Sequence, residues 1–428
     1  MTKLSMGVIA DDLTGAMDTA GAFASKGQRV RVMCKTISRP SLLTGVGVAC
    51  INTQTRNVDP AFALAPVRHA AKDLVDAGFG TFYKKIDSTG RGNLAAEFTA
   101  MLETTEAVAI IVCPAFPRLG RTVVDGRVLV HGRPVQHTTE GQDALAPVTS
   151  GNLVELLTAE GELTAASVGR SIVDAGPGTI AAEIKAQADK GHNVVVVDAV
   201  TDGHLDSLAD ASHEFPGFVL AGSAGLAYAI AGGMGGSTRN PVDAQVSGGP
   251  TLVIVGSRHE TNRGQLRALV EKGRATQIAL EPGEALSEPV DRRVYMARLL
   301  ESVRAELSAG HNVSLAWSDA ELTSGSATNP VADATDLDLF VGTLVYGAVR
   351  SVELSGLVIV GGDTAFAALG ALGGISVDVA GEVEPGVPYG VIADGPAAGV
   401  VLVTKAGGFG DERTLVRALD LVEGLTGS

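Results

Sequence analysis

The sequence predicts an α/β protein made of two doubly wound domains with largely parallel sheets and an active-site cleft between the domains. Short runs of Val, Ile, Leu and Ala recur along the whole chain without alternating with polar residues, as is typical of strands buried on both faces. Segments rich in Ala, Leu, Glu and Arg with helical spacing lie between these runs. Such an alternation of strands and helices indicates parallel sheets covered by helices on both faces.

The elements follow from these runs in order. We expect strands at MGVIA (6–10), GVGVACI (45–51), AVAIIV (107–112), VVVVDA (194–199), FVLAG (218–222), TLVIVGS (251–257), LVIVGG (357–362) and VVLVT (400–404). We expect helices over 60–77, 151–160, 179–190, 261–272 and 293–308. A stretch rich in Gly, Ser and Pro at 232–250 predicts a boundary between a domain of residues 1–235 and one of residues 236–428. The polar stretch 318–340 is expected to be a surface or active-site loop.

Composition excludes several classes of function. With 428 residues, of which 45% are hydrophobic, the chain can form the cores of two domains. Its net charge of −15 argues against nucleic acid and anionic membranes as partners. The three cysteines are odd in number and lack CxxC spacing, which predicts buried thiols in a reducing compartment: Cys34, Cys50 and Cys113. No run approaches a membrane span and no signal segment is recognisable, so a cytoplasmic protein is expected.

Polar residues follow the expected strands of the N-terminal half, where ligands of doubly wound sheets collect. Asp11 and Asp12 directly follow the first strand. Because adjacent like charges repel, the pair favours a base or a metal ligand over a single helix-capping Asp. Arg56 follows the second run, and FYKKIDSTGRGN (82–93) concentrates Lys84, Lys85, Asp87, Ser88 and Arg91. In an acidic protein these cations suit a carboxylate or phosphate, although a polar turn capped by Ser88 or Thr89 is the structural alternative.

The C-terminal half repeats a different pattern, in which a strand leads through a glycine-containing turn into a helix. The turns hold Ser257, then Gly361, Gly362, Asp363 and Thr364, and finally Gly407 and Gly408. Free N–H groups at such helix starts bind phosphates, whereas each glycine alone could serve packing. The dipeptide Gly-Lys is absent, so no P-loop is present, and no GxGxxG links a strand to a helix. The histidines show no metal-binding spacing, and metal ligands stay unknown.

The chain resembles the four-carbon acid sugar kinase family, which includes D-threonate, L-threonate, D-erythronate and 3-oxo-tetronate kinases, nearly from end to end. The resemblance rests on IADDLTGAMD (9–18), KKIDSTGRGN (84–93), PAFPRLGRTVVDG (114–126), GSAGLA (222–227), GSRHETNRGQ (256–265), GGDTA (361–365), PGVPYG (385–390) and KAGGFGD (405–411). Two positions depart from the family pattern: Gly90 stands where an apolar residue is usual, and Asn52 where an acid is common.

The resemblance implies that the N-terminal domain binds a small four-carbon sugar acid and that the C-terminal domain binds ATP. It implies nucleotide contacts from Ser257, Gly361, Gly362, Asp363, Thr364, Gly407 and Gly408, and substrate contacts from Asp11, Arg56, Lys85, Asp87 and Ser88. We hypothesise phosphoryl transfer from ATP, with Mg²⁺, to the terminal hydroxyl, for which Asp12, Lys84 and Arg91 are the catalytic candidates. Asp12 would accept or orient the hydroxyl proton, and Arg91 with Lys84 or Lys85 would hold the carboxylate and offset charge. Because adjacent strand residues point to opposite faces, only one of the two lysines is expected to face the ligand.

Two other functions are compatible with these residues. A lyase or aldolase would use Lys84 or Lys85 as a Schiff-base nucleophile near Asp87. A non-catalytic sensor would bind a sugar acid without turnover. A homodimer is expected from the frequency of dimers among cytosolic enzymes. The sequence leaves open which four-carbon acid, and which stereoisomer, is the substrate.

Overall fold

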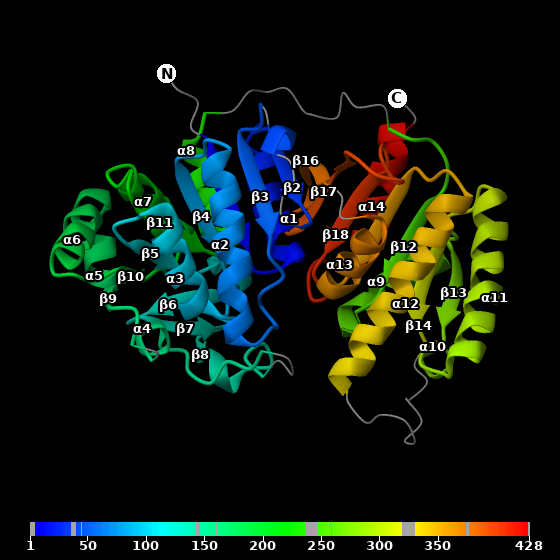
Figure 1. The fold of residues 1–428 in the computed structure, drawn as a ribbon, viewed down its shortest axis with the longest axis horizontal. Coiled ribbons are helices and arrows are strands. Elements are labelled where there is room, and N and C mark those ends of the chain that lie inside the picture. Colours follow the sequence, from blue (N-terminus) through cyan, green and yellow to red (C-terminus); the bar gives the residue numbers. More distant parts are fainter. Residues whose placement is uncertain are drawn as a thin grey trace. The chain divides into compact units, whose positions relative to one another are not determined.

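The computed structural model describes residues 5–35, 40–43, 45–142, 146–159, 161–235, 246–257, 259–318, 330–373 and 376–426. The chain divides into two compact units, Met1–Arg239 and Asn240–Ser428, called unit 1 and unit 2 below (Figure 1). The boundary predicted after residue 235 borders residues 236–245, which lie outside the described residues. None of the described helices is long and apolar enough to cross a membrane.

Unit 1 is built on a parallel sheet with the strand order β2-β3-β1-β4-β11-β5-β10-β9. Its strands are β1 (Met6–Ala10), β2 (Val30–Met33), β3 (Val48–Asn52), β4 (Thr81–Lys85), β5 (Ile110–Cys113), β9 (Ala165–Val168), β10 (Val194–Val197) and β11 (Val219–Gly222). The apolar runs explain this arrangement, since every residue of β1, β3, β5, β10 and β11 is buried.

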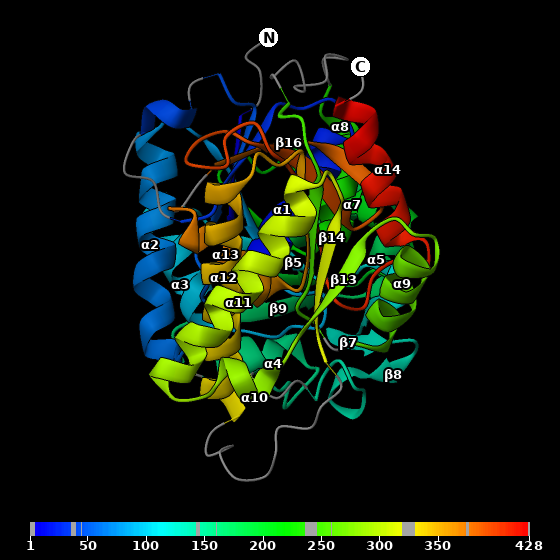
Figure 2. The ribbon, with the colours of Figure 1, turned by 90° about the vertical axis from the view of Figure 1, so that its right-hand side faces the viewer.

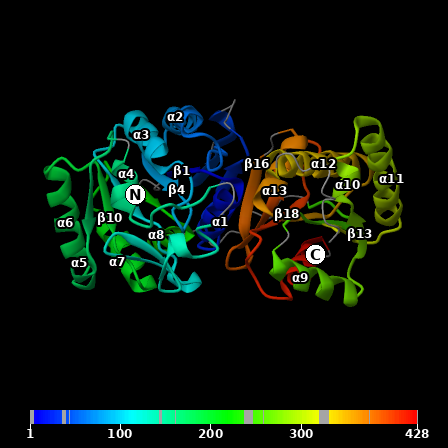
Figure 3. The ribbon, with the colours of Figure 1, turned by 90° about the horizontal axis from the view of Figure 1, so that it is seen from below.

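Helices cover both faces of the unit 1 sheet (Figure 3). On one face lie α1 (Leu13–Ala24), α8 (Ala224–Gly233), α7 (Asp202–Ser212), α6 (Pro177–Asp189) and α5 (Arg170–Asp174); on the other lie α2 (Pro60–Asp76), α3 (Leu94–Thr105) and α4 (Leu153–Thr158). A small antiparallel sheet is added by β6 (Arg121–Val124), β7 (Arg127–Val130) and β8 (Arg133–Pro134). Short 3₁₀ helices occur at Pro40–Leu43, Pro117–Leu119 and Val135–His137.

Unit 2 has the strand order β13-β14-β12-β15-β18-β17-β16. The parallel strands are β12 (Thr251–Val255), β13 (Thr276–Leu280), β14 (Val313–Trp317), β15 (Gly356–Val360) and β18 (Val401–Lys405), and the antiparallel ones are β16 (Ser376–Glu384) and β17 (Val387–Ile392). Figure 2 shows α11 (Pro289–Ser308), α12 (Pro330–Ser351) and α13 (Gly362–Ala371) on one face, and α9 (Glu260–Glu271) and α14 (Thr414–Thr426) on the other; α10 (Pro282–Ala285) is short.

The predicted fold class is confirmed, because both units are doubly wound and mainly parallel. The prediction of a loop over 318–340 is wrong in its second half. Residues 319–329 lie outside the described residues, but helix α12 begins at Pro330. Phe340, Val341, Leu344 and Val345 have helical spacing and are buried, which explains why the chain continues as a helix there.

Each sheet has a switch point at which the chain connections leave in opposite directions. In unit 1 the chain passes from β1 to β2, toward one edge of the sheet, and from β4 to β5, toward the opposite edge. In unit 2 the chain passes from β12 to β13, toward one edge, and from β15 to β16, toward the other. In doubly wound sheets ligands bind beyond the carboxyl ends of the strands at such points. We therefore expect ligands at the turns after β1, β4, β12 and β15.

Replacing Tyr83 with Phe should lower the free energy of unfolding by about 1.5 kcal/mol. The buried Tyr83 hydroxyl donates to the Ser223 carbonyl oxygen at 2.6 Å, and its loss leaves that buried acceptor without this donor. Urea unfolding followed by circular dichroism measures the effect. Tyr346→Phe, at a half-exposed position of α12, is the matched control and should change little. Equal stabilities of the two variants would contradict this account of Tyr83.

Candidate functional site

The two aspartates after β1 are held by one guanidinium group. Arg56, in the loop after β3, donates to Asp11 from Nε to Oδ2 at 2.8 Å and from Nη2 to Oδ1 at 2.9 Å. It also donates to Asp12 from Nη1 to Oδ2 at 2.6 Å and from Nη2 to Oδ1 at 2.7 Å. The Arg56 and Thr55 N–H groups donate to the Asp11 carbonyl oxygen, which fixes the loop beside β1. The repulsion between adjacent carboxylates is thus balanced by Arg56.

The two aspartates differ in their surroundings. Burial alone would raise the pKa of Asp11. The positive charges of Arg56 and Lys84 lower it by more than burial raises it, so the pKa lies below its usual range. Burial would lower the pKa of Arg56, but Asp11 and Asp12 outweigh it and raise that pKa. The Asp12 side chain is 15% exposed against 0% for Asp11, and it caps helix α1 by accepting from the Gly15 N–H at 2.9 Å. Of the two carboxylates, that of Asp12 is therefore the accessible one.

The two lysines of β4 turn to opposite sides of the sheet. Lys84 lies 2.9 Å from Glu97 Oε2 of α3, and both side chains are fully buried. Lys85 is also buried and donates to the Ile86 carbonyl oxygen at 2.8 Å. A Cβ atom placed on Gly15 would lie 2.9 Å from Lys85 Nζ, so this ammonium lies against the first turn of α1. Two positive charges therefore flank the end of β4.

Glu97 was not predicted from the sequence. Its carboxylate accepts from the Thr55 hydroxyl and is paired with Lys84. Burial raises the pKa of Glu97, and the nearby Asp11 charge adds to this, while Lys84 and Thr55 act against it. The available signal was a single acid in the otherwise apolar start of the helix, LAAEF (94–98). The sequence alone does not distinguish this acid from one exposed to solvent.

The turn after β4 is organised around Asp87. This carboxylate accepts from Arg91 Nε at 3.1 Å and Nη2 at 2.8 Å, and from the Thr89 N–H at 2.9 Å. Burial raises the pKa of Asp87, but Arg91 and Arg56 hold it well below its usual range. Ser88 is half-buried. The Asp87 carboxylate thus orients Arg91 through two hydrogen bonds.

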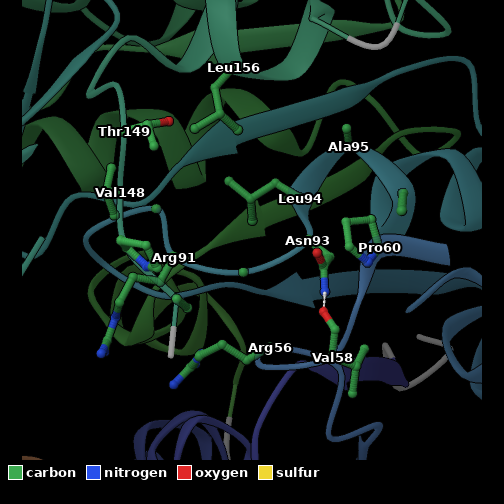
Figure 4. Close-up of a pocket in the computed structure, with 15 residues that line it drawn as sticks. Arg56, Val58, Pro60, Arg91, Asn93, Leu94, Ala95, Val148, Thr149 and Leu156 are labelled. Carbon is green, nitrogen blue, oxygen red and sulfur yellow. Dashed lines mark hydrogen bonds between the residues drawn. The ribbon is translucent and has the colours of Figure 1, made fainter. Parts of the chain in front are cut away.

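A cavity of about 300 Å³ lies beyond these charges in unit 1 (Figure 4). Arg56 and Arg91 line it, and their side chains extend toward the same side in the close-up. Asn93 Nδ2 donates to the carbonyl oxygens of Thr55 at 2.8 Å and Val58 at 2.9 Å, which joins the turn after β4 to the loop after β3. Apart from these polar residues the lining includes Pro60, Leu94, Val148 and Leu156.

The three glycine-containing turns of unit 2 touch one another, because β12, β15 and β18 are neighbours in the sheet. A Cβ on Gly256 would overlap Thr364 Oγ1, and one on Gly407 would overlap Ser257 Oγ. Gly361, with φ +115°, would bring its Cβ to 3.5 Å from the Ser257 nitrogen. The structure thus brings the predicted residues of these turns into one cluster.

Helix α13 starts in this cluster without a side-chain cap, since Gly361 is its N-cap residue. Its first-turn N–H groups are suited to an anion. Thr364 Oγ1 donates to Asp338 Oδ1 at 2.8 Å. Burial raises the pKa of Asp338 to about 6, and the neighbouring Asp363 charge adds to this. A second cavity, of about 380 Å³, adjoins Ser257 and is lined by Asn262, Arg263, Trp317 and Ser318 among others.

A metal centre made of protein side chains alone is not found in the described part of the chain. There, no group of three or more His, Cys, Asp and Glu side chains could hold a metal ion. Asp338, which accepts from Thr364, and Asp363 are two carboxylates beside the turn cluster of unit 2. A cation at this place would need further ligands from a bound molecule such as a polyphosphate.

Comparisons with known proteins agree with this division of the chain. Residues 6–230 match a family model described as a sugar-binding N-terminal domain, and residues 252–415 match one described as a nucleotide-binding C-terminal domain. The D-threonate kinase of Salmonella typhimurium is 31% identical, with 98% of this chain and 99% of that protein aligned. The D-erythronate kinase of Heliobacterium modesticaldum is 30% identical, with 96% of each chain aligned. A crystal structure from Salmonella typhimurium LT2 matches with a TM-score of 0.82 at 22% identity, over 97% of this chain and 98% of that one. This likeness shows the fold alone.

Replacing Glu97 with Gln should destabilise unit 1 by about 3 kcal/mol, because the buried Lys84 ammonium then lacks its carboxylate partner. Urea unfolding followed by circular dichroism measures this cost. The double variant Lys84→Met, Glu97→Met removes both charges and should regain most of the stability. If Glu97→Gln were as stable as the unchanged protein, the buried ion pair would not have the structural role assigned to it.

Proposed function

Because the chain belongs to the four-carbon acid sugar kinase family, we propose that it transfers the γ-phosphoryl group of ATP to the terminal hydroxyl of a four-carbon sugar acid. Threonate, erythronate and 3-oxo-tetronate are the candidate substrates. The observation that carries the proposal is the division of polar chemistry between the units. Paired arginines line a cavity in unit 1, while unit 2 presents a cluster of glycine-containing turns.

In unit 1 we assign the cavity to the sugar acid. Arg56 and Arg91 offer guanidinium groups that suit its carboxylate and hydroxyls. Asp11 accepts hydrogen bonds from Arg56, and Asp87 accepts them from Arg91. Ser88 adds a hydroxyl group in the turn after β4. Asp12, the more exposed carboxylate, would accept or orient the hydroxyl proton. Lys84 and Lys85 do not line the cavity; their charges, which lower the pKa of Asp11, would act on the transferring group through space.

In unit 2 we assign the turn cluster to the phosphates of ATP. The contacts would come from Ser257, Gly361, Gly362, Asp363, Thr364, Gly407 and Gly408. The first-turn N–H groups of α13 favour a phosphate there. Mg²⁺ would bind mainly through the phosphate oxygens, with Asp338 and Asp363 as candidate carboxylate ligands, and would neutralise charge that develops during transfer. The cavity beside Ser257 offers Trp317 for the base.

The Schiff-base alternative has less support. Lys84, one of its two candidate amines, is fully buried against Glu97, and neither Lys84 nor Lys85 lines the cavity. A Schiff-base lysine needs a neutral amine within reach of a carbonyl group. The sensor alternative leaves the turn cluster of unit 2 without a role.

We also propose that the enzyme acts in the cytoplasm as a homodimer. The buried thiols Cys34, Cys50 and Cys113 suit a reducing compartment. Dimers are the commonest assemblies of this kind of enzyme. The cleft between the domains, predicted from the sequence, stays a prediction.

The experiment that tests the function is ADP release with Mg²⁺ and ATP against D- and L-threonate, D- and L-erythronate and 3-oxo-tetronates, with a blank lacking the acid. Turnover that depends on one acid would identify both reaction and substrate. Binding of ATP without turnover on any acid would leave phosphoryl transfer but move the substrate elsewhere. Absence of ATP binding would contradict the proposal.

Replacing Asp12 with Asn should lower kcat by about a hundredfold or more, because the carboxylate that orients the hydroxyl proton is lost. Asparagine can still cap α1, so the fold should be kept. The dissociation constant of ATP should stay within about twofold, since the nucleotide is assigned to unit 2. Asp59→Asn, which alters the N-cap of α2, is the matched control. A kcat near that of the unchanged enzyme would remove the base assignment.

A further inference from the structure

Lys405 ends strand β18, directly before the turn that contains Gly407 and Gly408. Its side chain is buried, although a lysine before a phosphate-binding turn would be expected to reach the ligand. The ammonium donates to Asn262 Oδ1 at 2.9 Å and to the carbonyl oxygens of Ala406 at 3.0 Å, Gly407 at 3.2 Å and Phe409 at 2.8 Å. An ammonium has three N–H donors, and four acceptors already surround this one. No donor is left for a nucleotide.

The direction of these carbonyl groups fixes the direction of the neighbouring N–H groups. In a trans peptide the C=O of one residue and the N–H of the next point to opposite sides, and the described chain contains no cis peptide bond. Since the carbonyls of Ala406 and Gly407 point to Lys405 Nζ, the N–H groups of Gly407 and Gly408 point away from it. Those N–H groups belong to two of the proposed nucleotide contacts.

Helix α9 holds the same turn through two amide side chains. Gln265 Nε2 donates to the Phe409 carbonyl oxygen at 3.0 Å. Asn262 accepts from Lys405 and donates from Nδ2 to the Ser257 carbonyl oxygen at 3.2 Å. The ammonium of Lys405 therefore lies behind both the Ser257 turn and the glycine turn and joins them through Asn262.

We propose that Lys405 is a positioning residue of the nucleotide site: it gathers the carbonyl groups of Ala406 and Gly407, and thereby directs the N–H groups of Gly407 and Gly408 toward the phosphates. Lys405 itself does not touch the nucleotide. This inference rests on the proposed function, in which unit 2 binds ATP. The role proposed for Lys405 differs from that of the lysine in a P-loop, which contacts the phosphates directly.

The surroundings of Lys405 give this role a measurable pH dependence. Burial lowers the pKa of Lys405 to about 8, although the Glu384 carboxylate of β16 acts in the opposite direction. Glu384 is itself engaged by Arg417 and Thr414 of α14, and the side chains that α9 presents to Lys405 are the uncharged amides. His259, the N-cap residue of α9, lies beside Gly408. A bound polyphosphate favours the charged ammonium.

The direction of the pH dependence follows from the protonation of Lys405 in the free protein and in the nucleotide complex. Below pH 8 Lys405 is protonated with or without nucleotide, so affinity does not change with its titration. Above pH 8 the free protein loses the proton and must take it up again on binding. The dissociation constant of the Mg²⁺–ATP complex should therefore rise by up to about tenfold per pH unit above pH 8.

The test is titration calorimetry of the whole protein with ATP and Mg²⁺ at pH 7.5, 8.5 and 9.5, in two buffers of different ionisation enthalpy. We expect proton uptake at pH 8.5 in the unchanged protein, a measurement that needs no variant. Lys405→Met should weaken ATP binding at pH 7.5 by about tenfold or more and abolish the proton uptake. Its affinity for the sugar acid should not change. Lys272→Met, at the exposed end of α9, is the matched control.

The outcomes separate the two proposals. If the unchanged protein does not bind ATP, the proposed function fails and this inference fails with it. If it binds ATP without proton uptake at pH 8.5, Lys405 does not have the role assigned here. The same conclusion follows if a folded Lys405→Met protein binds ATP as tightly as the unchanged protein.

Discussion

The contact of Arg56 with both Asp11 and Asp12 is the interaction on which the candidate site of unit 1 depends. It joins the end of β1 to the loop after β3, and Arg56 also faces the turn after β4. A Cβ on Gly92, at φ +101°, would lie 3.3 Å from Asp11 Oδ2 and 3.4 Å from Arg56 Cγ, so this turn must stay close to the ion cluster. Without a cation between them, two adjacent carboxylates at the end of a buried strand would repel each other. The ends of three neighbouring strands are thus held together by one charged group.

The strand order explains why such different segments meet. Because β1 lies between β3 and β4, Ala10 at the end of β1 is level with Asn52 of β3 and with Lys85 of β4, so distant parts of the chain end at the same edge of the sheet. In unit 2, β15 lies between β12 and β18, and their turns form one cluster for the same reason. Both units use their switch points in this way. The proposed chemistry differs because unit 1 places charged side chains there and unit 2 places backbone N–H groups.

The sequence predicted the eight apolar runs that form β1, β3, β5, β10, β11, β12, β15 and β18, because such runs are a local feature. It did not predict β2, β9, β13 and β14, each of which contains a polar residue. It also predicted that Lys84 and Lys85 diverge, which follows from the two-residue period of a strand. It did not predict Glu97 as the partner of Lys84, since that pair requires the position of α3 over β4. The antiparallel strands β16 and β17 were also missed: their sequences contain Gly381, Pro388 and Gly390, which weaken a strand pattern. Which of the predicted residues touch ligands stays a prediction.

Both units contain buried charges whose cost to stability is not recovered by packing. Burial raises the pKa of Glu97 and of Asp338 and lowers that of Lys405, so in each case the surroundings disfavour the charged form relative to water. Apolar side chains of similar volume at Lys84 and Glu97 would give a core of similar stability. What the charged groups provide is a fixed direction for another group: Lys84 in one unit, and the turn after β18 in the other. The rigid placement of donors is the main contribution a protein can make to phosphoryl transfer, and it accounts for charges that folding alone would not favour.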